Sequence, residues 1–105
     1  MKRYKITIMP SAREGLLAIG EYIALDNPVR AISFIDEITA SLEKTLSIFP
    51  LSGRVSEDLD LAEEIRIWSH GNYNCYYRVL GDKKTIEVLF IFNASRDIRS
   101  LIQKL

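Results

Sequence analysis

The stretch that decides the fold runs from Asn72 to Asn93 and reads NYNCYYRVLGDKKTIEVLFIFN. Its two arms are rich in aromatic and β-branched residues, and the four residues from Gly81 to Lys84 between them are typical of a turn. This pattern predicts a β-hairpin. In the second arm the segment Val88–Phe92 has no polar residue, which indicates a strand inside a sheet with both faces covered.

The first arm of the hairpin has two different faces, because side chains alternate along a strand. One face carries Tyr73, Cys75, Tyr77 and Val79, and the other carries Asn74, Tyr76, Arg78 and Leu80. We expect helices to cover only one face of the sheet fully. The other face is therefore predicted to be open for a partner.

Length and composition indicate one globular domain over residues 1–105, since 48% of the residues are hydrophobic and 27% are charged. No apolar run is long enough for a signal peptide or a membrane span, which predicts a cytoplasmic protein without a membrane partner. The net charge is zero, so no general basic field for sequence-specific nucleic-acid binding is expected. Acidic residues outnumber basic ones from Ala31 to His70, which leaves room for a local basic patch at the two ends.

The first half of the chain predicts a strand followed by a helix. Residues Tyr4–Met9 alternate between polar and apolar, and Pro10 ends this strand. Ser11 is predicted to cap a helix that ends near Leu25, with Glu14 completing a capping box. Its apolar stripe comprises Ala12, Leu16, Leu17, Ile19, Ile23 and Ala24.

A second helix is predicted from Pro28 to Ile48, after a tight corner in which Asn27 or Asp26 acts as the cap. Its apolar face comprises Ala31, Ile35, Ile38, Leu42 and Leu46, flanked by Ile32, Phe34 and Phe49. The short corner makes the two helices an antiparallel hairpin, whose apolar side would cover one face of the sheet.

The remaining segments complete the predicted order β-α-α-β-β-β-α. Val55–Glu63 is predicted to be a loop, Glu64–Ser69 a strand, and Ser95–Leu105 a short final helix with Ser95 as its cap. The fold class is therefore α+β, with a helical hairpin packed on a mostly antiparallel sheet.

Several segments together resemble the ParE toxins of the ParE/RelE superfamily. They are Tyr4-Lys5-Ile6-Thr7, Pro10-Ser11-Ala12, Tyr22–Pro28, Phe49–Arg54, Ile65-Arg66, Tyr73–Val79 and Ser95–Ile98. The resemblance implies a toxin of a type II toxin–antitoxin system, held inactive in a hetero-oligomer with a cognate antitoxin. For the ParE branch it implies poisoning of DNA gyrase, whereas the RelE branch cleaves messenger RNA on the ribosome.

The catalytic residues of RelE-like enzymes are mostly missing from this chain. The positions of their lysines fall on Ile65 and Ile67, of an arginine on Asn74 and of a tyrosine on Ile102, so that Arg96 alone matches. An arginine does not deprotonate near neutral pH and cannot supply acid–base chemistry. We therefore expect a protein that is not an enzyme. A ribonuclease that uses Arg96 and a degenerate toxin that only binds antitoxin remain the alternatives.

No other residues suggest catalysis, a cofactor or a metal. His70, the single histidine, is interpreted as a turn residue before Gly71 rather than as an acid–base group. The single cysteine, Cys75, is interpreted as a core thiol, and these two residues do not make a metal-ligand set.

Five residues are predicted to bind the target or the antitoxin, namely Arg66, Trp68, Arg78, Arg96 and Arg99. If Ile65 and Ile67 face the helical hairpin, then Trp68 and its neighbouring arginine point outward with the composition of a binding hot spot. The alternative is that Trp68 packs beneath the final helix while the arginines pair with the acidic segment 57–64. An antitoxin helix is expected in an apolar groove of the helical hairpin, with an extended antitoxin segment at a sheet edge.

Overall fold

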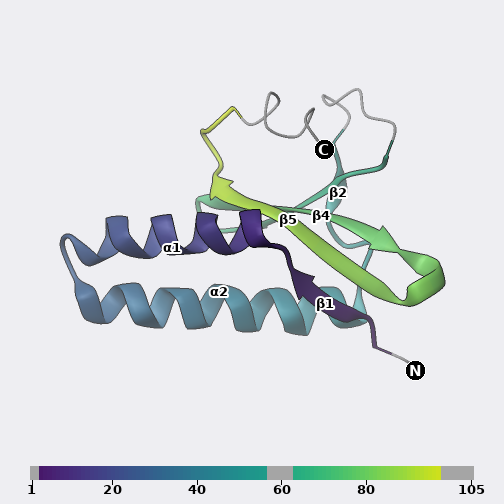
Figure 1. Cartoon of the computed structure of the whole chain (residues 1–105), viewed down its shortest axis with the longest axis horizontal. Helices are drawn as coiled ribbons and strands as arrows, with labels where there is room; N and C mark the ends of the chain where they lie inside the picture. Colours follow the sequence, from purple (N-terminus) through teal and green to yellow (C-terminus); the bar gives the residue numbers. More distant parts are fainter. Residues whose placement is uncertain (1–2, 57–62, 98–105) are drawn as a thin grey trace.

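The computed structural model describes residues 3–56 and 63–97. Its elements are β1 (Lys5–Ile8), α1 (Pro10–Ala24), α2 (Pro28–Ile48), β2 (Arg54–Val55), β3 (Arg66–His70), β4 (Tyr73–Leu80), a 3-10 turn (Gly81–Lys83) and β5 (Thr85–Asn93). The two helices lie side by side and form one layer against the sheet (Figure 1). The α+β class and the predicted order β-α-α-β-β-β are confirmed for the described residues, which also contain the short additional strand β2.

The sheet has five strands in the order β1-β5-β4-β3-β2. The central hairpin joins β4 and β5, and Lys84 closes it in the left-handed region at a φ of 49°. All pairs are antiparallel except β1 with β5, where Lys5 lies opposite Thr85. The predicted loop from Val55 is wrong at its start, because β2 pairs with β3 and places Val55 opposite Arg66.

A β-bulge interrupts the central hairpin. Tyr76 lies opposite Phe90 while Tyr77 lies opposite Val88, so Leu89 is the extra residue. Leu89 and Phe90 both belong to the hydrophobic cluster on the sheet face that lies away from the helices. The bulge thus explains why two consecutive residues of β5 lie on the same face, while Val88 and Ile91 on either side of them belong to the helix-side cluster.

The two helices begin by different means. Helix α1 starts at Pro10 with Met9 as its N-cap and with no side-chain cap, so the predicted Ser11 capping box is wrong. Pro10 has a fixed φ and lacks an N–H group, which suits the first helical position and starts the helix one residue before Ser11. In α2 the predicted Asn27 cap is confirmed, since its Oδ1 accepts a hydrogen bond from Arg30 N at 3.0 Å.

Two buried clusters cover the two faces of the sheet. The helix-side cluster comprises Ala12, Leu16, Ile19, Phe34, Ile38, Leu42, Leu46, Cys75, Tyr77, Ile86, Val88 and Ile91. The opposite cluster comprises Ile65, Ile67, Tyr76, Leu89 and Phe90. The predicted alternation of β4 is confirmed, because Cys75 and Tyr77 face the helices. The expectation of an open second face is wrong, since the side chains of the opposite cluster are only 2% to 8% exposed.

Helix α1 approaches β5 closely at Gly15. A Cβ atom at this position would overlap the carbonyl oxygen of Ile91, so only glycine permits the observed spacing. The contact places α1 alongside the part of β5 that extends beyond its pairing with β1.

Candidate functional site

The outer side of the helical hairpin carries an apolar groove of about 390 Å³ between α1 and α2. Its lining residues are Leu16, Leu17, Gly20, Glu21, Ala24, Ala31, Ile32, Ile35 and Asp36. Leu17 was expected in the buried stripe of α1 but is 66% exposed, and Ile32 is 69% exposed. Leu17 points outward because Gly15 and Leu16 occupy the buried side of α1.

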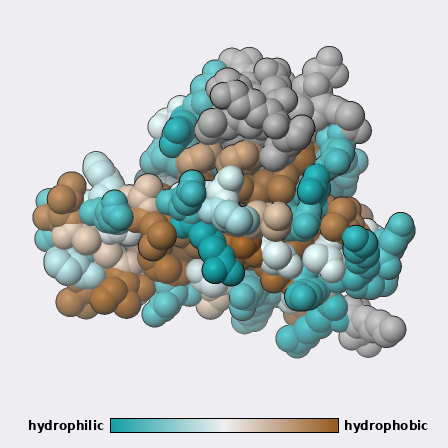
Figure 2. Space-filling view, viewed as in Figure 1, coloured by the Kyte–Doolittle hydropathy of each residue, from teal (hydrophilic) through white to brown (hydrophobic). Residues whose placement is uncertain are grey.

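Two carboxylates stand among the apolar residues of this groove. Glu21 on α1 and Asp36 on α2 have no ion pair within residues 3–56 and 63–97. Further large apolar side chains are exposed where the two helices join, namely Tyr22, Leu25 and Val29. Figure 2 shows hydrophobic residues over this closed end of the hairpin, at the left of the view. The surface is therefore apolar with an acidic margin.

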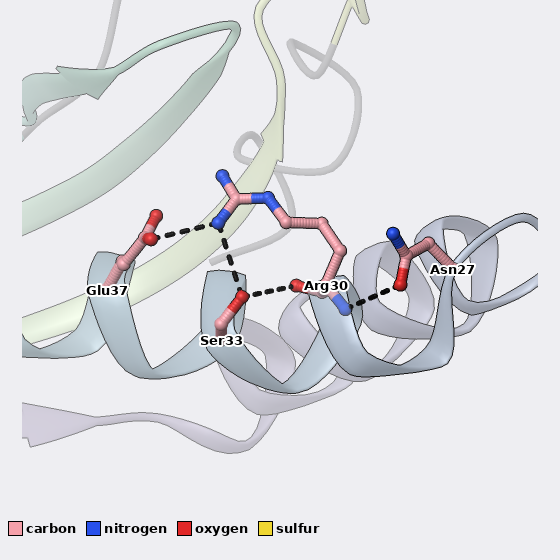
Figure 3. A network of polar contacts seen from close by, with 4 residues as sticks. All are labelled: Asn27, Arg30, Ser33 and Glu37. Atoms are coloured by element: carbon pink, nitrogen blue, oxygen red, sulfur yellow. Dashed lines mark hydrogen bonds and ion pairs between the residues drawn. The ribbon is translucent and has the colours of Figure 1, made fainter.

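The first turns of α2 hold a polar network around Arg30 (Figure 3). Arg30 Nη1 donates to Glu37 Oε1 at 2.9 Å and to Ser33 Oγ at 3.3 Å. The hydrogen bond between Arg30 and Glu37 raises the pKa of Arg30 and lowers the pKa of Glu37. The guanidinium carbon also lies 5.5 Å from the ring centroid of Phe34. Arg30 is thus held along its own helix.

The guanidinium of Arg66 binds to groups within the same chain. Its Nη1 donates to Leu51 O at 3.2 Å and to Gly53 O at 2.8 Å, and its Nη2 forms an ion pair with Glu64 at 2.9 Å. The arginine therefore holds the turn after α2 against β3.

The condition under which Trp68 would point outward is not met. Ile65 and Ile67 face away from the helices, because Ile67 lies opposite Tyr76 in the second cluster. Trp68 lies opposite Cys75 and packs against the helix-side cluster, where its ring is 5.7 Å from that of His70. The outward tryptophan of the sequence-based hypothesis is therefore a partly buried side chain.

His70 is the last residue of β3, and its ring also lies 6.0 Å from that of Phe34. The single histidine thus belongs to an aromatic group that joins β3 to α2. The structure gives it a packing role next to the turn at Gly71.

Arg78 lies between two carboxylates. Its Nη1 is 2.6 Å from Glu63 Oε2, and its Nε donates to Glu87 Oε1 on the neighbouring strand at 2.7 Å. The hydrogen bonds to Glu63 and Glu87 raise the pKa of Arg78, and the bond to Glu63 has the larger effect. The interpretation in which arginines pair with the acidic segment is confirmed for Arg66 with Glu64 and for Arg78 with Glu63, whereas residues 57–62 lie outside the described chain.

Arg96 differs from these arginines. It is exposed beyond the end of β5, and its guanidinium carbon lies 4.3 Å from the ring centroid of Phe92. Among the described residues its guanidinium has no ion pair or hydrogen bond. It lines a second cleft of about 320 Å³ together with Gly15, Ala18, Ile19, Tyr22, Tyr73, Phe92 and Asn93.

The structure does not bring the predicted binding residues together. Arg66 and Trp68 lie on the helix side of β3, Arg78 lies on the opposite face, and Arg96 lies beyond the end of β5. Arg99 and residues 98–105 of the predicted final helix lie outside the described residues, whereas Ser95–Asp97, its predicted start, are not helical. Sequence reasoning missed the exposed groove residues Leu17 and Ile32, although each makes the apolar side of its helix wider than one buried stripe requires.

The structure also bears on metals and membranes. Within residues 3–56 and 63–97 no group of three His, Cys, Asp or Glu side chains is placed to hold a metal ion. In the same residues neither helix combines the length and the hydropathy that crossing a bilayer requires.

Comparison with known proteins identifies relatives of this fold. The chain is similar to a structure of the chromosomal ParDE toxin–antitoxin system from P. aeruginosa, with 21% identity and a TM-score of 0.70 over 89% of this chain and 98% of the other. It is also similar to the toxin–antitoxin complex RelBE2 from Mycobacterium tuberculosis, with 22% identity and a TM-score of 0.69 over 90% and 97% of the two chains. The archaeal RelE–RelB complex from Pyrococcus horikoshii gives 17% identity and a TM-score of 0.53 over 90% and 99%.

No protein with a curated description matches the chain. The pattern of one sequence family, described as the ParE toxin of the type II toxin–antitoxin system parDE, matches residues 6–98. This match spans the helical hairpin and all of the described sheet except Lys5. The chain therefore belongs to the ParE toxin family of type II toxin–antitoxin systems.

Proposed function

We propose that this toxin acts by binding DNA gyrase in the cytoplasm without hydrolysis, and that a cognate antitoxin neutralises it by placing an amphipathic helix in the groove between α1 and α2. The observation that carries the proposal is the open apolar groove on the helical hairpin. Leu17 and Ile32 stand in it 66% and 69% exposed. Contiguous apolar surface of this kind marks a protein interaction site.

The floor of the groove suits a helix. Gly20 and Ala24 on α1 and Ala31 on α2 contribute almost no side-chain bulk, so a partner backbone can approach closely. Leu17 and Ile32 would then pack against apolar residues that recur every three or four positions on the partner. Burial of the two side chains would contribute about 1.5–3 kcal/mol each as an upper bound.

Binding rather than hydrolysis is supported by the surroundings of Arg96. The described lining of its cleft contains no histidine, lysine or carboxylate that could supply acid–base chemistry. His70 packs instead between Trp68 and Phe34. Gyrase is proposed as the target because the chain belongs to the ParE family.

One observation favours ribonuclease activity as the second candidate. Tyr22 and Tyr73 line the same cleft as Arg96, so a phenol and a guanidinium would both face a phosphate placed there. This arrangement makes ribosome-dependent RNA cleavage the enzymatic alternative.

The test incubates the purified chain with gyrase, supercoiled plasmid and ATP, and scores trapped double-strand breaks with and without a candidate antitoxin. We expect breaks that appear with the toxin and disappear with the antitoxin. A parallel reaction contains ribosomes and messenger RNA. Cleavage of the RNA that Arg96→Gln abolishes, with the plasmid unaffected, would replace the gyrase proposal by the ribonuclease.

The groove is tested separately through antitoxin affinity. Ile32→Lys places a charge in the groove, and we expect it to weaken antitoxin binding at least about 30-fold, as for an interface hot spot. The matched control is Leu51→Lys, since Leu51 is 61% exposed but lies outside the groove. Equal affinities of the two variants, measured by calorimetry, would exclude the groove as the antitoxin site.

A further inference from the structure

The second cleft lies on the other side of α1 from the groove. Gly15 and Ala18 of α1 form one wall, and Phe92 and Asn93 at the end of β5 lie opposite. Tyr22, which is 72% exposed, and Tyr73 add two aromatic rings. The cleft thus combines small apolar residues with aromatic side chains.

The turn that follows β5 holds the side chain of Asn93 and the backbone of Arg96 in place. Ser95 donates from its N and Oγ to Asn93 Oδ1 at 2.9 and 2.7 Å, and Arg96 N donates to Asn93 O at 3.0 Å. Ala94 N donates to Asn72 O at 2.7 Å, which ties the turn to the residue before β4. Because Asn93 Oδ1 is already used, this side chain offers only N–H donors to the cleft.

Arg96 adds a positive charge without an acidic neighbour in the cleft. Arg30, Arg66 and Arg78 each form an ion pair with a carboxylate, whereas the guanidinium of Arg96 rests on Phe92 at 4.3 Å. Within the described chain no acidic side chain lines the cleft, and Asp97 is not one of its lining residues. Donors and a cation beside apolar walls suit a ligand that carries a carboxylate next to an apolar body.

We propose that this cleft binds an acidic peptide segment of a partner protein. An aromatic side chain of the segment would lie on Ala18 between Tyr22 and Tyr73, while a neighbouring carboxylate accepts hydrogen bonds from Arg96. A volume of about 320 Å³ suits one large side chain. A nucleic acid is the less suitable ligand, because its affinity comes from several phosphate contacts and the described lining of the cleft contains a single cation. The inference rests on the proposed function only in taking the chain to act by binding.

The test uses two short peptides that differ in one charge, acetyl-Phe-Asp-amide and acetyl-Phe-Asn-amide. Each is titrated into the full-length chain while NMR follows the amide of Ala18 and the Nε–H of Arg96. We expect the acidic peptide to bind at least about tenfold more tightly, since a hydrogen bond to a charged group is stronger than a neutral one. Arg96→Gln should remove this preference, and Arg54→Gln, an exposed arginine outside the cleft, should retain it.

A second pair of variants tests the apolar part of the cleft. Ala18→Leu fills the space and should weaken both peptides, whereas Ala40→Leu, at an exposed position of α2, should leave them unchanged. Equal affinity of the two peptides, or an unchanged preference in Arg96→Gln, would overturn the inference. So would a short oligothymidylate that binds the cleft more tightly than the acidic peptide. Neither gyrase nor antitoxin is present, so failure here is distinct from failure in the plasmid assay.

Discussion

Replacing Tyr77 by phenylalanine should destabilise the turn that follows α2. The Tyr77 hydroxyl donates to Pro50 O at 2.8 Å and accepts from Gly53 N at 2.9 Å. The side chain is 0% exposed, so no water replaces these partners in the folded state. Tyr77→Phe deletes one oxygen atom and leaves both backbone groups without their partner.

The magnitude follows from the two groups that lose this partner. An unpaired buried donor or acceptor costs about 1–3 kcal/mol. Gly53 is buried, so the loss of the partner of its N–H should cost an amount near the upper end of this range. Pro50 is partly exposed, so the loss at its carbonyl should cost an amount near the lower end. We therefore expect a loss of about 2–4 kcal/mol in the free energy of unfolding. For a domain of this size the midpoint of thermal unfolding should fall by about 8–16 °C.

Urea unfolding, followed by the fluorescence of the single tryptophan, measures this loss. The matched control is Tyr73→Phe on the same strand, whose hydroxyl has no hydrogen bond within the described residues. It should change the free energy of unfolding by no more than about 0.5 kcal/mol. Equal stability of Tyr77→Phe and the parent chain would refute the structural role assigned to the buried hydroxyl.

Three further predictions concern stability. Gly15→Ala should destabilise the fold by about 1–3 kcal/mol because its methyl group meets the backbone of β5. Gly20→Ala should stabilise it by up to about 1 kcal/mol, because its Cβ would meet only a flexible side chain at 3.5 Å, and thermal melts compare the two variants. Burial raises the pKa of Cys75 to about 12 from the usual 9.0, so only the thiol of the unfolded chain ionises between these two values. The free energy of unfolding should therefore fall with rising pH in this range, by up to about 1.4 kcal/mol per pH unit. In Cys75→Ala the urea midpoint should depend less on pH. Asn27→Ala should cost about 1 kcal/mol through loss of the cap of α2, while Asn27→Asp keeps the acceptor and most of the stability in the same measurement.

Elements that depend on near neighbours could be predicted from the sequence. The start of α2 follows from Asn27 and Pro28, since the first suits a cap and the second suits the first helical position. The central hairpin follows from two strand-forming arms around the turn at Gly81. Both signals act over a few residues, so the rest of the chain does not override them.

The orientation of β3 could not be predicted, because alternation defines two faces without saying which one the helices cover. Ile65 and Ile67 on one face and Trp68 on the other are all hydrophobic, and the sheet buries both faces. The short β2 gave no periodic signal because it contains only two residues.

The candidate site shows the same limit for charged residues. Arg66, Arg78 and Arg96 look equivalent in the sequence, yet among the residues that the structure describes only the first two are bound to carboxylates. Arg78 finds Glu87 because the hairpin register places them opposite each other. The availability of an arginine thus depends on tertiary neighbours that a linear pattern does not reveal.

The pairing of β1 with β5 also fixes an order of assembly. Lys5 meets Thr85, a residue roughly 80 positions later in the chain, so β1 is synthesised long before its partner strand. The corner between α1 and α2 joins neighbouring segments, and closing a short loop costs less entropy than closing a long one. We therefore expect the helical hairpin and its apolar groove to form early, and the sheet to close only when β5 has left the ribosome. An antitoxin that recognises the groove would then meet its toxin while translation is still in progress.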